Sequence, residues 1–255
     1  MVSEHMENTV RSTFCCVIFR LSLIIFIFSF ALNYKGLNYR TEWVEYPDIE
    51  ATCKRIGAKP TWNNADGSPL YTLPVIYDPS TDTVLADSTA IADYLDETYP
   101  DTPRLFPPGT RALQAAFQSA QASTFGRREA MYKLVVLAAC LNLNEPSYEY
   151  FRRTREEEMG KRLEDIAPEG MVREQAWQEF EEDWLTVGKW YKAGGDGPFI
   201  MGDAPCHADM VIAARLMWAR QVFGKQSASW ARIIALDGGR WARFMQNFEQ
   251  YSVVV

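Results

Sequence analysis

Before residue 100, apolar and polar positions follow strand-like or helix-like spacings in short, separate stretches. Apolar and polar residues alternate over 39–46, and two short apolar runs flank a polar turn at 78–81, which is the pattern of strands. A proline followed by acidic residues marks a helix start at 47–50, because these residues suit a first helical turn. The predicted elements are strands at 39–46, 71–77 and 82–86, helices at about 47–57 and 88–99, and a loop at 63–69.

The pattern changes after a proline-rich segment. Pro103, Pro107, Pro108 and Gly109 lie within seven residues, which is typical of a linker. Every apolar pattern beyond it has helical spacing, with predicted helices at 110–141, 147–165, 171–193, 206–223 and 238–251. The sequence therefore predicts an α/β domain over 31–102 and an all-α domain over 110–255.

Residues 1–30 form an unusual hydrophobic leader. Residues 15–32 carry one charge, Arg20, and their length is at the lower limit of about 17–25 residues for a membrane span. A membrane anchor is one interpretation. The other is a buried strand at 13–19 followed by a buried helix at 21–35. A third is that residues 1–29 are a wrongly translated gene segment.

Composition narrows the possible function. The chain of 255 residues carries a net charge of −7, which argues against nucleic acid as a partner, because phosphates require clustered Lys and Arg. Its five cysteines show no C-x-x-C spacing, which indicates reduced thiols and a cytoplasmic location. The histidines are His5 and His207 alone, so we expect no metal site.

Leu73-Pro74 is the first candidate binding element. A proline stands here inside an apolar, β-branched run, where a strand normally needs a backbone donor. With a cis bond before Pro74, the N–H and C=O of Leu73 would face outward and could pair with an extended peptide. The alternative is an edge-strand proline without a ligand.

Asp87-Ser88 is the second candidate. Ser88 suits the N-cap of the following helix, and a helix N-terminus attracts a carboxylate. Asp87 beside it could pair with an ammonium group. A carboxylate and an ammonium on one carbon form the γ-glutamyl head group of glutathione. The alternative is ordinary helix capping.

Two other motifs are interpreted as structural. Asp209 follows Cys206 at capping-box spacing, which predicts the start of a buried helix, with His207 as a solvated neighbour. The charged run at 152–158 predicts a solvated helix face with i,i+4 ion pairs.

From about Phe30 to Tyr251 the sequence resembles fungal glutathione transferases of the etherase-like class. The resemblance implies a thioredoxin-like domain followed by a helical domain, a homodimer, and glutathione as cosubstrate. It also implies a backbone clamp at Leu73 and Pro74 and γ-glutamyl contacts at Asp87 and Ser88. The stretches that carry it are 30–37, 42–50, 66–76, 94–100, 150–155 and 238–243.

The leader departs from that family. Its members have a W-S-P-N-T-W-like loop before the first helix, whose serine hydroxyl favours the thiolate of glutathione. Here the loop is absent, and the serine position, counted back from Phe30, falls on Ser22. We therefore weigh three hypotheses: a transferase acting on a small hydrophobic electrophile or ether, a catalytically impaired glutathione-binding module, and a membrane-anchored transferase-like protein held by residues 15–32.

Overall fold

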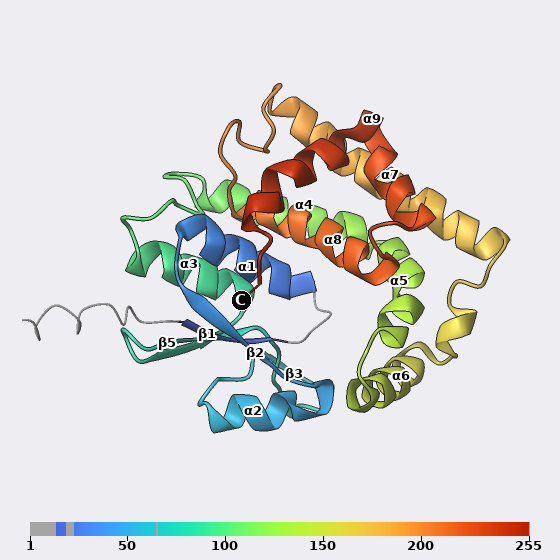
Figure 1. Cartoon of the computed structure of the whole chain (residues 1–255). Coiled ribbons are helices and arrows are strands. Elements are labelled where there is room, and N and C mark those ends of the chain that lie inside the picture. Colours follow the sequence, from blue (N-terminus) through green and yellow to red (C-terminus); the bar gives the residue numbers. More distant parts are fainter. Residues whose placement is uncertain (1–13, 19–22, 65, 255) are drawn as a thin grey trace, which may run out of the picture.

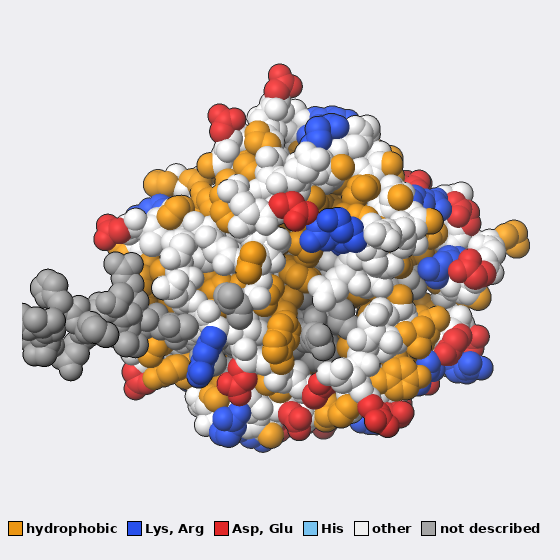
Figure 2. Space-filling view, viewed as in Figure 1, with side chains coloured by type: hydrophobic (Ala, Val, Ile, Leu, Met, Phe, Trp, Pro, Cys, Tyr) orange, Lys and Arg blue, Asp and Glu red, His pale blue; other side chains and the backbone are white. Residues whose placement is uncertain are grey.

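The computed structural model describes residues 14–18, 23–64 and 66–254, with the backbone alone at 15–18, 23 and 24. A sheet with flanking helices occupies the first part of the described chain, and a larger group of helices follows it (Figure 1). On the face shown in Figure 2, acidic and basic side chains are interspersed with hydrophobic ones. The predicted α/β domain followed by an all-α domain is confirmed.

The sheet has the strand order β2-β1-β5-β6. β1 (Phe14–Ile18) runs parallel to β2 (Tyr39–Trp43) and antiparallel to β5 (Val75–Asp78), which pairs antiparallel with β6 (Thr83–Ala86). α1 (Leu23–Lys35) and α3 (Ser88–Thr98) cover one face, and α2 (Ile49–Arg55), preceded by the 3₁₀ turn η1 (Tyr46–Asp48), covers the other (Figure 1).

The leader contributes to this sheet. A strand and a helix were one interpretation of residues 13–35, and β1 and α1 are present there. β1 lies between β2 and β5, so it satisfies backbone groups on both neighbours. Among the described residues, no helix is both long and apolar enough to cross a membrane. The domain boundaries at 31–102 and 110–255 stay predictions.

Two predictions in this domain need correction. The predicted strand at 71–77 begins only at Val75, because Pro74 has no N–H to donate to a neighbouring strand. The predicted loop at 63–69 is the turn of a short hairpin between β3 (Trp62–Asn63) and β4 (Pro69–Leu70). Two residues in each strand carry too little periodicity to be recognised in the sequence.

The helical domain surrounds α8 (His207–Phe223), which lies near its centre (Figure 1). α8 packs against α1 of the first domain and against several helices of its own domain. The predicted helices at 171–193 and 206–223 are confirmed. The remaining elements are α4 (Arg111–Gly126), α5 (Ala130–Leu141), α6 (Glu145–Met159), η2 (Leu163–Asp165), α7 (Met171–Ala193), α9 (Ala228–Phe248) and η3 (Glu249–Tyr251).

Three helix predictions here were wrong in extent. The predicted helix at 147–165 is α6, which ends at Met159, where Gly160 adopts a left-handed conformation with φ 65°. The predicted helix at 110–141 is two helices, because Glu129 adopts a left-handed conformation with φ 51° between them. The predicted helix at 238–251 begins earlier, at Ala228, and its backbone is non-helical from Leu236 to Gly239. Nothing in the residue type of Glu129 signals a left-handed turn. In contrast, the glycines of Asp237-Gly238-Gly239 do signal the non-helical backbone within α9.

The capping box of α8 is confirmed. The Asp209 carboxylate accepts hydrogen bonds from the Cys206 N–H at 3.0 Å and from the Ile200 N–H and the Tyr191 hydroxyl at 2.9 Å each. Asp209 and Cys206 are fully buried. Burial raises the pKa of the Asp209 carboxyl and raises that of the Cys206 thiol. Both groups therefore fix the start of a core helix rather than react.

His207 does not lie in solvent, as the sequence had suggested. Its side chain is 1% exposed, and its ring lies 5.0 Å from that of Phe106. Neither ring nitrogen has a hydrogen-bond partner among the described residues. Burial, with Arg111 nearby, lowers the pKa of His207 to about 4, against the opposing influence of Asp93 and Asp96.

A buried ion pair ties the sheet domain to the linker that follows it. Lys35 at the end of α1 donates to Asp96 of α3 at 2.8 Å and to the Pro103 carbonyl at 3.1 Å. Asp96 also accepts from the backbone N–H groups of Leu105 and Phe106, at 2.9 and 2.8 Å. The pair therefore holds α1, α3 and the linker in one arrangement.

Two contacts cross between the domains. Glu45, ahead of α2, accepts hydrogen bonds from Asn144 at 2.6 Å and from Ser147 of α6. Near the end of the described chain, the Val253 carbonyl accepts from Asn33 at 2.7 Å and from the Tyr39 hydroxyl at 2.8 Å. These bonds fix the helical domain against both ends of the sheet domain.

We expect Lys35→Met to lower the free energy of unfolding by about 3–5 kcal/mol, because Asp96 would keep a buried charge without its cation. Urea denaturation measures the loss. The matched control is Lys54→Met, which removes an exposed ion pair with Glu50 and should leave the free energy of unfolding nearly unchanged. Equal effects of the two substitutions would contradict the role given to Lys35.

His207 should make stability depend on pH. The unfolded chain protonates this residue near pH 6.5 and the folded chain only near pH 4. Between these values the unfolded state binds more protons, so the free energy of unfolding falls as pH falls, by up to about 3 kcal/mol. We expect His207→Gln to flatten this part of the profile, measured by urea denaturation from pH 7 to pH 4.5.

Comparing the pH profiles of the wild-type chain and of His207→Gln separates the contribution of His207 from those of other titrating groups. Burial raises the pKa of Asp183 to about 6, which has the opposite effect, since the folded state then gains stability as pH falls. Asp183 is present in both proteins, so its contribution cancels in the difference. An unchanged slope in His207→Gln is the result that contradicts the prediction.

Candidate functional site

The first part of the candidate site is the segment that enters β5. The peptide bond between Leu73 and Pro74 is cis, and both residues are buried. Among the described residues, neither the N–H nor the C=O of Leu73 forms a backbone hydrogen bond. A backbone segment without such bonds in the described chain suits a ligand that binds as an extended strand.

The second part is the N-terminus of α3, where the structure corrects the predicted cap. Asp87, not Ser88, is the N-cap residue, and its Oδ1 accepts from the N–H groups of Thr89 and Ala90 at 3.0 Å each. Ser88 is the first helical residue and is half-buried. Asp87 is exposed, so its second carboxylate oxygen faces solvent, beside helix N–H groups that attract anions.

The strand register brings the two parts together. Val75 pairs with Ala86 where β5 meets β6, so Pro74 and Asp87 each lie one residue beyond the same paired position. Antiparallel partners in neighbouring strands lie about 5 Å apart. The free backbone of Leu73 and the start of α3 therefore face one region at the end of the sheet.

The backbone of Asp87 is unusual, with φ 78° and ψ 124°. Residues other than glycine adopt a positive φ at a cost of about 1–3 kcal/mol, and such residues concentrate at ligand sites. A cap needs an ordinary extended conformation at this position. The strained backbone of Asp87 thus costs free energy, and helix capping alone does not explain why the protein keeps it.

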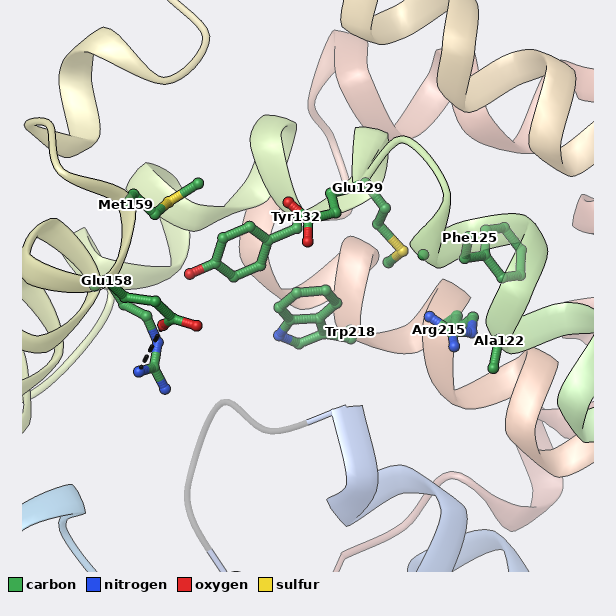
Figure 3. A pocket seen from close by; sticks show the side chains of 11 residues that line it. Ala122, Phe125, Glu129, Tyr132, Glu158, Met159, Arg215 and Trp218 are labelled. Atoms are coloured by element: carbon green, nitrogen blue, oxygen red, sulfur yellow. Dashed lines mark hydrogen bonds and ion pairs between the residues drawn. The ribbon is translucent and has the colours of Figure 1, made fainter. Parts of the chain in front are cut away.

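A cavity of about 790 Å³ lies in the helical domain. Figure 3 shows Tyr132 and Trp218 facing its interior, with Phe125 at one side, Met159 at the other, and the first turn of α1 on the open side. The lining side chains come from α4, α5, α6 and α8 and are mostly apolar or aromatic: Ala122, Phe125, Met131, Tyr132, Met159 and Trp218, with Glu129, Arg155, Glu158 and Arg215 as the charged members.

Burial shapes the chemistry of this cavity. It raises the pKa of the Tyr132 phenol, so this hydroxyl stays protonated near neutral pH. Arg155 and Glu158 form an ion pair at 3.4 Å on the same helix. Burial lowers the pKa of the Arg215 guanidinium to about 10, which leaves it charged at neutral pH. The cavity suits an aromatic molecule.

The structure brings Leu73, Pro74, Asp87 and Ser88 to one region, whereas Ser22 lies outside the described residues. Ser22 stays a prediction as the catalytic residue. The sequence analysis did not find the cavity residues, because aromatic residues at helical spacing are more often part of a core. Among the described residues, no group of three or more His, Cys, Asp or Glu side chains could hold a metal ion.

Comparison with known proteins agrees with this geometry. Residues 29–98 match the profile of the glutathione S-transferase N-terminal domain, and residues 112–251 match that of the C-terminal domain. The chain belongs to the glutathione S-transferase family. The resemblance to this family inferred from the sequence is confirmed, while the class within it stays a prediction.

Solved glutathione S-transferases of fungi are similar over almost the whole chain. Glutathione transferase GSTFuA3 of Phanerochaete chrysosporium is 42% identical, with a TM-score of 0.89 over 95% of this chain and 98% of its own. CsGST63524 of Ceriporiopsis subvermispora, crystallised in complex with glutathione, is 41% identical, with a TM-score of 0.90 over 95% of this chain and 99% of its own.

A curated relative is more distant. The glutathione S-transferase-like protein ustS of Aspergillus flavus is 30% identical over an alignment of 231 residues, which covers 82% of this chain and 77% of that protein.

Proposed function

We propose that this protein is a glutathione transferase that binds glutathione at the end of the sheet and transfers its thiolate to a small hydrophobic electrophile or ether in the helical cavity. The observation that carries the proposal is the register of β5 and β6, which sets the unpaired backbone of Leu73 beside the start of α3. The glutathione complex of CsGST63524 supports the choice of ligand.

Three parts of glutathione have a partner in this arrangement: the peptide main chain, the γ-glutamyl carboxylate and the γ-glutamyl ammonium. The backbone of Leu73, next to Pro74, pairs with the main chain of the tripeptide as an added strand. The N–H of Ser88 at the start of α3 receives the γ-glutamyl carboxylate. The free carboxylate oxygen of Asp87 pairs with the γ-glutamyl ammonium. The positive φ of Asp87 supports this role, because residues in such strained conformations concentrate at ligand sites.

The reaction is a nucleophilic substitution. The sulfur of glutathione forms a bond to an electrophilic carbon, and the leaving group departs with its bonding electron pair. A hydroxyl that donates to the sulfur favours the thiolate, and Ser22 is the residue proposed for that role. The cavity holds the electrophile against Tyr132 and Trp218.

We also propose that the protein acts as a homodimer in the cytoplasm. Trp43, Trp62 and Leu70 are exposed by 50%, 70% and 38%, and Trp62 pairs with Leu70 across the β3–β4 hairpin. Large exposed apolar side chains that cluster favour a protein interface. Cys53, Cys140 and Cys206 are free thiols, in keeping with a reducing compartment.

A second candidate function is a glutathione-binding module without catalysis. The absence of a W-S-P-N-T-W-like loop before α1 favours it. The two functions share the glutathione site and differ only in what happens to the sulfur. Binding and turnover must therefore be measured separately.

Asp87→Asn tests the glutathione site. Asparagine caps helices as well as aspartate does and tolerates a positive φ, so α3 should stay intact. It lacks the negative charge, so we expect the dissociation constant of glutathione in calorimetry to rise about tenfold, as for the loss of one charged hydrogen bond. Ser88→Ala, which keeps the backbone N–H, is the matched control and should change the constant less. An unchanged constant in Asp87→Asn would contradict the site.

Ser22→Ala tests catalysis. We expect kcat with 1-chloro-2,4-dinitrobenzene to fall about a hundredfold or more, because the loss of one hydrogen-bond donor that stabilises an anion costs about 10²–10³ in rate. The dissociation constant of glutathione should stay nearly the same. Ser29→Ala, at a buried position of α1, is the control for a serine lost elsewhere in this segment. Glutathione binding without turnover by the wild-type chain would favour the second candidate function.

A further inference from the structure

Arg215 is one of the four charged residues that line the cavity, and the proposed reaction uses none of the four. It lies on α8, lines the cavity, and is placed beside Phe125 and Ala122 (Figure 3). Its Nε donates to the Gln121 side chain at 2.9 Å, and its Cζ lies 4.5 Å from the centre of the Phe125 ring. These contacts fix the plane of the guanidinium against the cavity wall.

Arg215 has no carboxylate partner among the described residues. Every ion pair within 4.0 Å in that part of the chain involves other cations, and no hydrogen bond is formed by Nη1 or Nη2 of Arg215. Arg220 on the same helix shows the usual arrangement, because it pairs with Glu249 at 2.7 Å. A desolvated cation without a counter-ion is costly, and proteins normally pair it.

The other charges of the cavity do not neutralise Arg215. Arg155 and Glu158 pair with each other. Glu129 stands at the exposed junction between α4 and α5, where water screens its charge. The inner part of the cavity therefore combines aromatic walls with one uncompensated positive charge.

We infer that the second substrate is an aromatic carboxylate, whose ring packs against Tyr132 and Trp218 and whose carboxylate accepts from the free N–H groups of Arg215. Arginine presents two parallel donors that match the two oxygens of a carboxylate. The burial of the guanidinium strengthens this pairing, because the surrounding dielectric constant is lower than that of water. The transfer step of this inference rests on the proposed function, whereas the binding step does not.

The binding test uses a matched pair of probes without a leaving group. 3,5-Dinitrobenzoate and 3,5-dinitrobenzamide differ in charge and little in size. With the full chain and saturating glutathione, we expect calorimetry to show the benzoate bound at least about tenfold more tightly than the benzamide, as for a charged hydrogen-bonded pair. Arg215→Gln should abolish this preference, and Arg215→Lys should keep part of it.

Arg220→Gln is the control variant. It removes an arginine from the same helix outside the cavity and should keep the preference for benzoate. Circular dichroism at the assay temperature establishes that each variant is folded. The inference is overturned if the wild-type chain binds both probes equally or binds neither, or if Arg215→Gln and Arg215→Lys weaken both probes by the same factor.

A turnover test separates this inference from the proposed function. With 4-chloro-3,5-dinitrobenzoate, the thiolate of glutathione adds at C4 and chloride leaves with the bonding pair. We expect Arg215→Gln to lower kcat/KM about tenfold or more for this compound and less than threefold for the corresponding benzamide. If the wild-type chain turns over neither compound but still prefers the benzoate probe through Arg215, the transferase proposal fails and the carboxylate site stands.

Discussion

The buried pair of Lys35 and Asp96 is the interaction on which the arrangement of the two domains depends. It joins the last turn of α1 to α3 and, through the N–H groups of Leu105 and Phe106, to the linker. The Leu105 carbonyl in turn accepts from the His207 N–H at the start of α8. One chain of hydrogen bonds therefore runs from the sheet domain to the central helix of the other domain. Because α1 is a rigid helix, fixing its last turn also fixes its first turn beside the cavity (Figure 3).

Lys35, which is buried, and Arg215, which is half-buried in the cavity wall, have opposite surroundings. Lys35 has a carboxylate and a carbonyl as partners, so its charge is satisfied within the fold. Arg215 has an amide oxygen and an aromatic face. Neither of these compensates a full charge in a desolvated position. A structural role therefore accounts for Lys35 completely. For Arg215 it accounts only for the Nε and for the ring contact, which leaves the Nη1 and Nη2 groups for a ligand in the cavity.

The sequence predicts those features that local chemistry determines. The capping box at Cys206 and Asp209 and the break before Gly238 and Gly239 follow from residue types at fixed spacing, and the structure has both. The burial of His207 could not be predicted in this way, because it depends on the linker folding back over the start of α8. The cap position was assigned to Ser88 instead of Asp87 for a different reason, since either residue type suits an N-cap.

The cavity is harder still to predict from the sequence. Its walls come from four helices, and each aromatic residue on them has the spacing of an ordinary core residue. An arginine within an apolar helix was the one available signal, because a charge at a core position needs a partner. Arg215 stands between Ala214 and Leu216, both fully buried. Only the three-dimensional arrangement shows that no carboxylate lies opposite it in the described chain.

The fold and catalysis place different requirements on the leader, residues 1–30. β1 satisfies β2 and β5 through backbone hydrogen bonds, which any strand-forming sequence can supply, so the sheet tolerates a segment unlike that of the family. Glutathione binding, as proposed, also relies mainly on backbone at Leu73 and on the start of α3. Activation of the sulfur is different, because it requires one side-chain hydroxyl at one place. In the function we propose, Ser22 supplies that hydroxyl, so it is the residue on which a transferase and a binding module with the same fold would differ.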